Sequence, residues 1–130
     1  MSAKGDRTST CGKADARKRL EDAQAFLVTA EAADNDDVIA TNAIHAAIAA
    51  SDVLCCLGLG ERSSSTTHDD AVGLLKRLDG KLANVLARSL GFKTRAAYES
   101  TDVSAKDAAR TVRNAQVLVD AAEHALLGAG

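Results

Sequence analysis

The sequence contains no proline and no tryptophan, and only 2% of its residues are aromatic. Helix interiors tolerate proline least, whereas β-strands favour aromatic and β-branched residues. Alanine, leucine and every type of charged residue are well represented, as is typical of close-packed helices. The composition therefore argues against a β-rich protein and predicts an all-α fold.

Cysteine is also scarce, with three in 130 residues. Cys11 lies in a polar N-terminal segment, and the neighbours Cys55 and Cys56 would point in different directions on a helix. We therefore expect no disulfide framework, small core residues at positions 55 and 56, and a reducing, cytoplasmic environment.

Long apolar runs are missing as well. Residues 1–11 are polar and lack the apolar run of a signal peptide, and no window approaches the roughly 20 apolar residues of a membrane span. We expect residues 1–12 to form a disordered tail ahead of one helical domain at residues 13–130, with no membrane association.

The net charge of the chain is small, −2 at pH 7, with a pI near 5.9. This balance argues against a protein that coats nucleic acid by bulk electrostatic attraction. Any contact with nucleic acid must therefore be focused on a local group of cations.

Apolar residues recur at steps of three and four along five segments. These predict helices at residues 13–33, 37–57, 68–78, 82–90 and 105–127, and Ser104 with Asp107 forms the best-marked helix start, similar to a capping box. We expect Gly91 to kink or cap the fourth helix before a turn at residues 93–98. The second segment is apolar around much of its circumference and should be central. Short connections between amphipathic helices predict an antiparallel up-and-down bundle of four to five helices. The alanine-rich faces of the first two helices could also pack on a second subunit.

Three segments resemble the HEPN family of small helical domains. They are NAIHAAIAASD at residues 42–52, KTRAAY at residues 93–98 and DVSAKDAAR at residues 102–110, and the resemblance spans about residues 13–127. It implies a dimer-forming bundle that is often a metal-independent ribonuclease of toxin–antitoxin or antiviral systems, and sometimes only a nucleotide- or partner-binding module. Catalytic members carry an arginine followed, after four to six residues, by a histidine. Here Lys93 and Tyr98 occupy those positions.

The two replacements change the available chemistry. Cleavage through a 2′-hydroxyl needs a proton acceptor, a proton donor and a cation for the phosphorane. An unperturbed tyrosine, with a pKa near ~10, is ionised about one part in a thousand at pH 7, which costs roughly 4 kcal/mol when it acts as base. Lys93 can bind phosphate, but without the two-pronged contact of arginine. On one helix Arg95 shares a face with Tyr98, whereas Lys93 would reach Tyr98 only through a bend or from a second subunit.

Other cations and polar residues suggest further roles. Together with Arg95, the cations Lys106, Arg110 and Arg113 are the candidate phosphate- or RNA-binding residues, and the alternative is a solvated helix face. His45 and Asp52 are expected to form a polar core, with Arg110 or Arg113 as the partner of Asp52.

Two further patterns of histidine residues give weaker indications of a functional site. Arg62 and His68 also fit the spacing of the family's catalytic pair, by chance on our interpretation. The three histidines fall on separate segments, so we expect no metal site and no cofactor.

Two functions remain open at this point. The first is a HEPN-like protein that binds RNA or nucleotides. Its enzymatic version is a degenerate ribonuclease with Lys93 and Tyr98 as catalytic residues. The second is a non-catalytic, dimerising module that binds a protein partner such as a nucleotidyltransferase or toxin. Both predict a homodimer.

Overall fold

The computed structural model describes residues 8–64, 68–98 and 103–129, and gives the side chains of these residues except at positions 68 and 93–98. Within these residues, five helices and two short strands follow one another. They are β1 (Thr8–Thr10), α1 (Lys13–Ala32), α2 (Asp36–Leu59), β2 (Glu61–Ser63), α3 (His68–Lys76), α4 (Gly80–Tyr98) and α5 (Ala105–Gly128).

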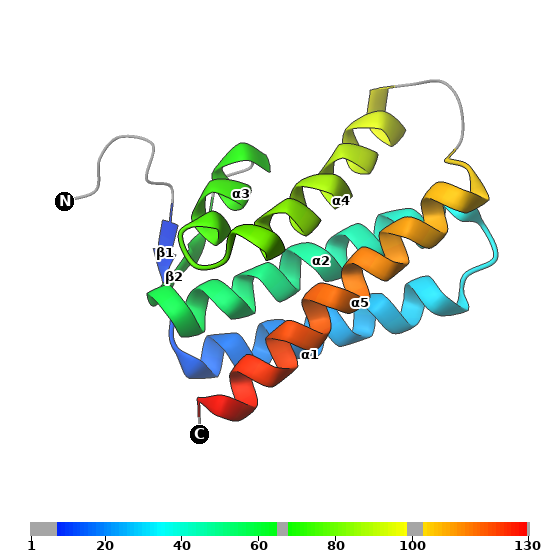
Figure 1. Cartoon of the computed structure of the whole chain (residues 1–130). Coiled ribbons are helices and arrows are strands. Elements are labelled where there is room, and N and C mark those ends of the chain that lie inside the picture. Colours follow the sequence, from blue (N-terminus) through cyan, green and yellow to red (C-terminus); the bar gives the residue numbers. More distant parts are fainter. Residues whose placement is uncertain (1–7, 65–67, 99–102, 130) are drawn as a thin grey trace.

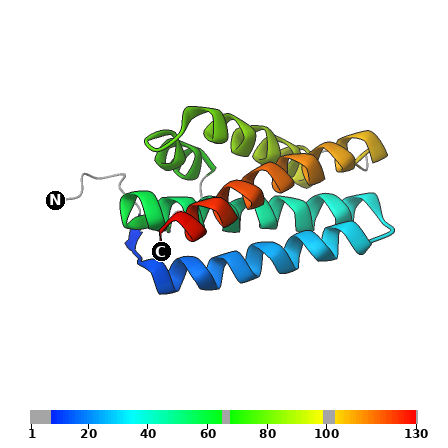
Figure 2. The ribbon, with the colours of Figure 1, turned by 60° about the horizontal axis from the view of Figure 1, so that its bottom comes forward.

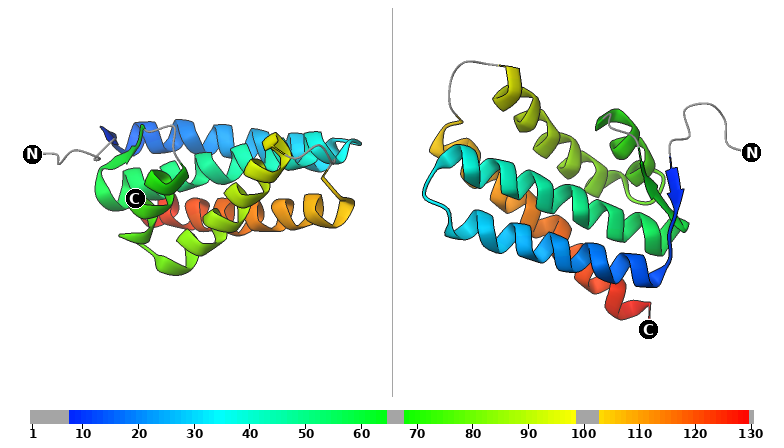
Figure 3. Two further views of the ribbon diagram at one scale, coloured as in Figure 1. Left: turned by 90° about the horizontal axis from the view of Figure 1, so that it is seen from above. Right: turned by 180° about the vertical axis from the view of Figure 1, so that it is seen from behind.

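The long helices form the predicted antiparallel up-and-down bundle, with α2 in its centre (Figure 1). Helix α2 contacts all the other helices, and α1 and α5 also contact each other. Figure 2 shows α1 and α2 lying side by side with α5 across them, and the rear view in Figure 3 shows the same arrangement from the other side. Helices α3 and α4 complete the bundle on the side away from α1.

Alanine makes up much of the core between α1 and α2. Ala16 and Ala23 on α1 and Ala43, Ala46 and Ala50 on α2 are each 0% exposed. Side chains this small allow two helix axes to approach closely. The alanine-rich faces that could have packed on a second subunit are thus covered within the chain.

Local sequence signals set the helix ends. Asn35 caps α2 by accepting a hydrogen bond from the amide of Val38 at 3.1 Å, and Ser104 caps α5 through the amide of Asp107 at 3.1 Å. Gly60 ends α2 with a φ of 73°, in the left-handed region where only glycine is comfortable. The capped start of α5 agrees with the sequence prediction.

Helix α4 is longer than its apolar pattern predicts. We expected a kink or cap at Gly91 followed by a turn at residues 93–98, but the helix continues to Tyr98. Gly91 has no positive φ, and a side chain at its position would meet no atom within 4 Å. Glycine is therefore accommodated inside the helix here and does not terminate it.

Residues 8–12 are ordered, contrary to the disorder expected for residues 1–12, of which residues 1–7 lie outside the described residues. Strand β1 pairs antiparallel with β2, with Ser9 opposite Arg62. The amide of Cys11 continues the pairing by donating to the carbonyl of Gly60 at 3.0 Å. Composition did not predict these strands because each is only three residues long.

A disulfide joins Cys11 to Cys56, and this corrects the expectation that the cysteines stay unpaired. The two residues are 45 positions apart, and β1 carries Cys11 to the end of α2 where Cys56 lies. Cys55 remains a buried free thiol, as the prediction of a small core residue requires.

Helix α2 is long and apolar enough to cross a membrane by length and composition alone, which corrects the expectation that no window of the chain approaches a membrane span. However, 67% of its most apolar window is buried inside the bundle. That burial is the pattern of a core helix, and it agrees with the central place of α2.

Candidate nucleic-acid interface

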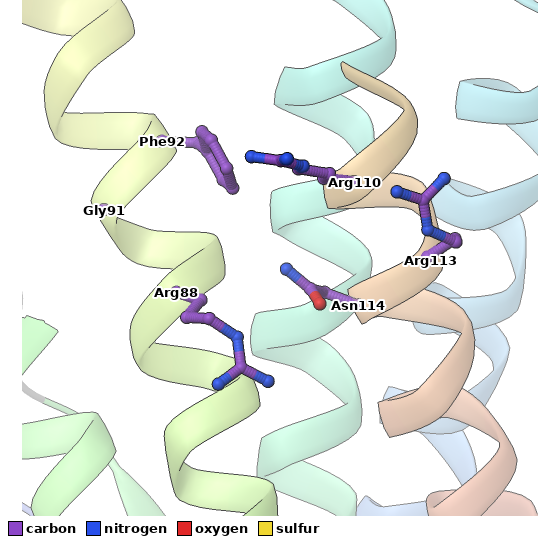
Figure 4. A pocket seen from close by; sticks show the side chains of 6 residues that line it. All are labelled: Arg88, Gly91, Phe92, Arg110, Arg113 and Asn114. Atoms are coloured by element: carbon purple, nitrogen blue, oxygen red, sulfur yellow. The ribbon is translucent and has the colours of Figure 1, made fainter. Parts of the chain in front are cut away.

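A groove of about 490 Å³ lies between the C-terminal half of α4 and the N-terminal half of α5 (Figure 4). Its volume falls in the range of roughly 300–1,000 Å³ that is common for ligand sites. The described residues that line it are Arg88, Gly91, Phe92, Arg110, Arg113 and Asn114. Half of these lining residues are arginines, so the groove favours an anion.

Helix α4 supplies one wall of the groove. Arg88 and Phe92 are four residues apart and share a face, because side chains at this spacing are neighbours on a helix. Leu86 and Leu90 are buried on the other side of α4 and attach it to the core. Gly91 has no side chain, and the space beside its Cα is open, since a Cβ there would meet no atom within 4 Å.

Helix α5 supplies the opposite wall. Its buried residues Ala108, Thr111 and Ala115 face the core, and this orientation turns the residues next to them outward. In Figure 4, Arg110 extends across the groove toward the ring of Phe92, and the side chain of Asn114 points from α5 toward α4. Arg88 reaches from α4 toward α5, while Arg113 lies on the outer side of α5.

Acidic side chains lie near two of these arginines: Asp107 near Arg110, and Glu31 and Asp36 beside Arg113 in a second pocket that α5 forms with α1 and α2. Asp107 lies 3.8 Å from Arg110, measured from its Oδ1 to Nη1, and the Arg110 side chain is 50% exposed. A pair this long and this exposed contributes about 0–1 kcal/mol. A phosphate could therefore replace Asp107 as the partner of Arg110 at little cost.

Of the candidate phosphate-binding residues, Arg110 and Arg113 line the groove and Lys106 does not. Lys106 is exposed in the first turn of α5, one turn before Arg110. Lys93, Arg95 and Tyr98 belong to the last turns of α4, and their side chains lie outside the described residues.

The sequence analysis missed Arg88, Phe92 and Asn114. A signal existed for the first two, because a cation and an aromatic ring four apart on a helix share a face. Asn114 carries no such signal, and only the approach of α4 to α5 brings it to the groove.

Asp52 is buried, and its partners differ from those expected. Arg19 of α1 donates to Asp52 Oδ2 from Nε at 3.0 Å and from Nη2 at 2.9 Å, and Arg62 of β2 lies 3.6 Å from the same oxygen. Arg110 and Arg113, which we expected in this role, line the groove instead. The reason is topological, since Asp52 faces α1 and β2.

Burial shifts the pKa of two groups near this cluster. Desolvation raises the pKa of Asp52 above its ordinary value of 3.8, while Arg19 and Arg62 oppose the rise. Desolvation also raises the pKa of the Cys55 thiol to about 11, with the Asp52 carboxylate adding to the effect. Cys55 is therefore protonated and unreactive at neutral pH.

His45 is not part of a polar core. It is exposed on α2, and its ring stacks on Phe26 of α1 with centroids 5.2 Å apart and an interplanar angle of 29°. The apolar surroundings in the sequence suggested burial, but His45 is exposed and contacts α1 only through Phe26 among the ring contacts described.

The pair Arg62 and His68 lies only partly within the described residues. Arg62 is directed to Asp52, and the side chain of His68 lies outside the described residues. No group of three or more His, Cys, Asp or Glu side chains that could hold a metal ion occurs in the part of the chain that the structure describes.

Comparisons with known proteins add no assignment. No model of a protein family matches the chain, and no curated protein matches it significantly.

Proposed function

We propose that this chain binds RNA or a nucleotide through its phosphates in the groove between α4 and α5. The observation that carries the proposal is the gathering of Arg88, Arg110 and Arg113 around one groove in a chain of net charge −2. An acidic protein that concentrates arginine at one place offers the focused contact that its overall charge does not.

The chemistry of the lining groups suits a single strand or a nucleotide. Guanidinium groups bind phosphate with paired hydrogen bonds. An aromatic ring at the same place allows a base to stack, and such stacking is worth roughly 1–3 kcal/mol per base. Phe92 supplies the ring, and the amide of Asn114 can donate to and accept from a base edge.

The HEPN-like segment extends this site along α4. Residues 93–98 follow Phe92 directly, so Lys93 and Arg95 are within about 5 Å of it along the helix axis. They provide two more cations at the same end of the bundle. Phosphate binding by Lys93 and Arg95, together with stacking by Tyr98, would lengthen the path for a strand.

A degenerate ribonuclease of a toxin–antitoxin or defence system is the enzymatic form of this proposal. Because α4 continues straight through residues 93–98, Lys93 and Tyr98 are about 140° apart around its axis. Catalysis by the pair would need the same residues from a second subunit, and we propose a homodimer on that ground. We also propose that the protein works in the cytoplasm, where RNA substrates are present.

Fluorescence anisotropy with a labelled single-stranded RNA tests the binding. Arg88→Ala and Arg110→Ala should each weaken binding about five- to twentyfold, as expected for loss of one charge-assisted phosphate contact. Gly91→Leu should also weaken binding, because the new side chain would occupy the groove. The fold should tolerate this change, since a Cβ at position 91 meets no atom within 4 Å.

The matched control is Arg17→Ala, which removes the same charge from the exposed face of α1. Equal losses in this control and in the groove variants would refute binding in the groove. A protein that ignores RNA and nucleotides at low salt but copurifies with a protein partner would favour the alternative, a partner-binding module.

Catalysis needs a separate assay. Purified protein is incubated with mixed RNA beside the double variant Lys93→Ala, Tyr98→Phe, and both samples are analysed on a denaturing gel. The ribonuclease form predicts cleavage by the original chain and none by the double variant. Equal cleavage by both, or none by either, removes the catalytic role and leaves the binding proposal intact.

A further inference from the structure

We propose that Cys11 and Cys56 form a redox-sensitive disulfide, which keeps strand β1 paired with β2 when it is oxidised and releases β1 when it is reduced. This device is separate from the groove between α4 and α5. It lies at the other end of the bundle, where β1 and β2 are found (Figure 1).

The first argument is the weakness of the strand pair by itself. Strands β1 and β2 have three residues each and form a two-stranded sheet with no further strand. A two-stranded ribbon is at best marginally stable in water, even when it is longer than this. The disulfide next to β1 and the hydrogen bond from the Cys11 amide to Gly60 therefore determine whether β1 stays paired.

Release of β1 would change the surroundings of Arg62 and of the edge of β2. Opposite Ser9 of β1 lies Arg62, which in turn lies 3.6 Å from the buried carboxylate of Asp52. Without β1, the backbone groups of Glu61–Ser63 form an open strand edge, and Arg62 loses the strand that positions it. Both cysteines are buried while the bridge is intact, since Cys11 is 7% and Cys56 3% exposed, so release of β1 would uncover Cys11.

The chemistry needs only a low-molecular-weight disulfide and its thiol. Two thiolates of a reductant attack in turn: the first takes one protein sulfur into a mixed disulfide and the second releases it, which leaves two protein thiols and one oxidised reductant. Oxidation runs the same exchange in reverse. In a cytoplasmic protein, as proposed above, such a pair is commonly a redox sensor and not a permanent bridge.

Cys55 does not compete in this exchange, although it is next to Cys56. Its thiol is 2% exposed and faces the core, and its raised pKa of about 11 keeps it protonated at neutral pH. Thiolate is the species that attacks a disulfide. The pairing of Cys11 with Cys56 is therefore selective.

Hydrogen exchange of the intact chain tests whether the disulfide controls the pairing of β1 with β2. Samples are equilibrated with oxidised glutathione or with dithiothreitol, and amide exchange is followed by mass spectrometry. The amides of residues 8–11 and 61–63 should exchange at least about tenfold faster in the reduced sample, whereas those of α2 and α5 should keep their protection.

Two variants sharpen the result. Cys11→Ala should show the fast exchange of β1 in both buffers, and Cys55→Ser should keep the difference between the buffers. Equal protection of β1 in oxidised and reduced chains would overturn the proposal. Faster exchange throughout α2 and α5 on reduction would overturn it as well, because the disulfide would then stabilise the whole fold and not the pairing of β1 alone.

Discussion

Arg19 donates two hydrogen bonds to one oxygen of Asp52, from Nε at 3.0 Å and from Nη2 at 2.9 Å, and thereby ties α1 to α2 inside the bundle. Its remaining nitrogen, Nη1, donates to Asp22 at 3.0 Å, and Asp22 also accepts from Lys18 at 2.8 Å. One guanidinium thus links a buried carboxylate to a surface ion pair.

Replacing Arg19 by alanine should lower the free energy of unfolding by about 2–3 kcal/mol, because it leaves the buried Asp52 carboxylate with only the longer contact to Arg62. Urea denaturation followed by circular dichroism measures the change. Arg17→Ala, two residues earlier on the exposed face, should change it by no more than about 0.5 kcal/mol. Equal effects of the two substitutions would show that the pair contributes no more than a surface charge.

The stability of the chain should also carry a pH dependence from Asp52. Burial raises the pKa of this carboxyl above 3.8, so the folded chain binds its proton more tightly than the unfolded chain does. The contribution of Asp52 to the free energy of unfolding is therefore largest below pH 3.8 and falls as the pH rises through the raised pKa.

Comparison with Asp52→Asn isolates this term. The stability of the original chain relative to the variant should be lower at pH 7 than at pH 4, as measured by urea midpoints at both values. A relative stability that rises between pH 4 and pH 7 would mean that the arginines dominate over burial and that the pKa is lowered.

The state of the cysteines can be counted directly. The sequence has three cysteines, of which one is free and buried while two form the disulfide. Alkylation of the oxidised chain with iodoacetamide, followed by mass spectrometry, should add no label to the folded protein. It should add one label in denaturant and three in denaturant with reductant. Two labels on the folded, unreduced chain would contradict the pairing of Cys11 with Cys56.

Glycine substitutions test the course of two helix ends. Gly91→Ala should raise the free energy of unfolding by about 0.5–1 kcal/mol, because α4 runs through this position and the new methyl group meets no atom. Gly60→Ala should lower it by about 1 kcal/mol, since Gly60 has a φ of 73°. Destabilisation by Gly91→Ala would restore the break that the sequence pattern suggested.

The helices of the bundle were predictable because their signals are local. The apolar steps along α2 and the cap formed by Ser104 depend on residues within a few positions of one another. The course of α4 beyond Leu90 was not predictable in this way. Gly91 is typical of a helix end, yet its φ is not positive and α4 continues through it to Tyr98.

Long-range partners were the harder part. Arg19 is three residues after Ala16 and so falls on the buried face of α1, and a charge at that place could have been matched with Asp52. The disulfide had no comparable signal, because a polar segment with one cysteine does not indicate which helix end it will reach. For the groove, the cations of α5 identified Arg110 and Arg113, whereas only the approach of α4 to α5 brings Asn114 to the site.

The salt dependence of RNA binding tests the central claim most directly, because phosphate contacts release counterions in proportion to their number. For a single strand, the slope of log affinity against log salt concentration should flatten by about 0.7 for each phosphate-binding arginine removed. Arg88→Ala with Arg110→Ala should therefore flatten the slope by about 1.4, while Arg17→Ala leaves it unchanged. A double variant with the slope and affinity of the original chain would contradict phosphate binding in the groove between α4 and α5.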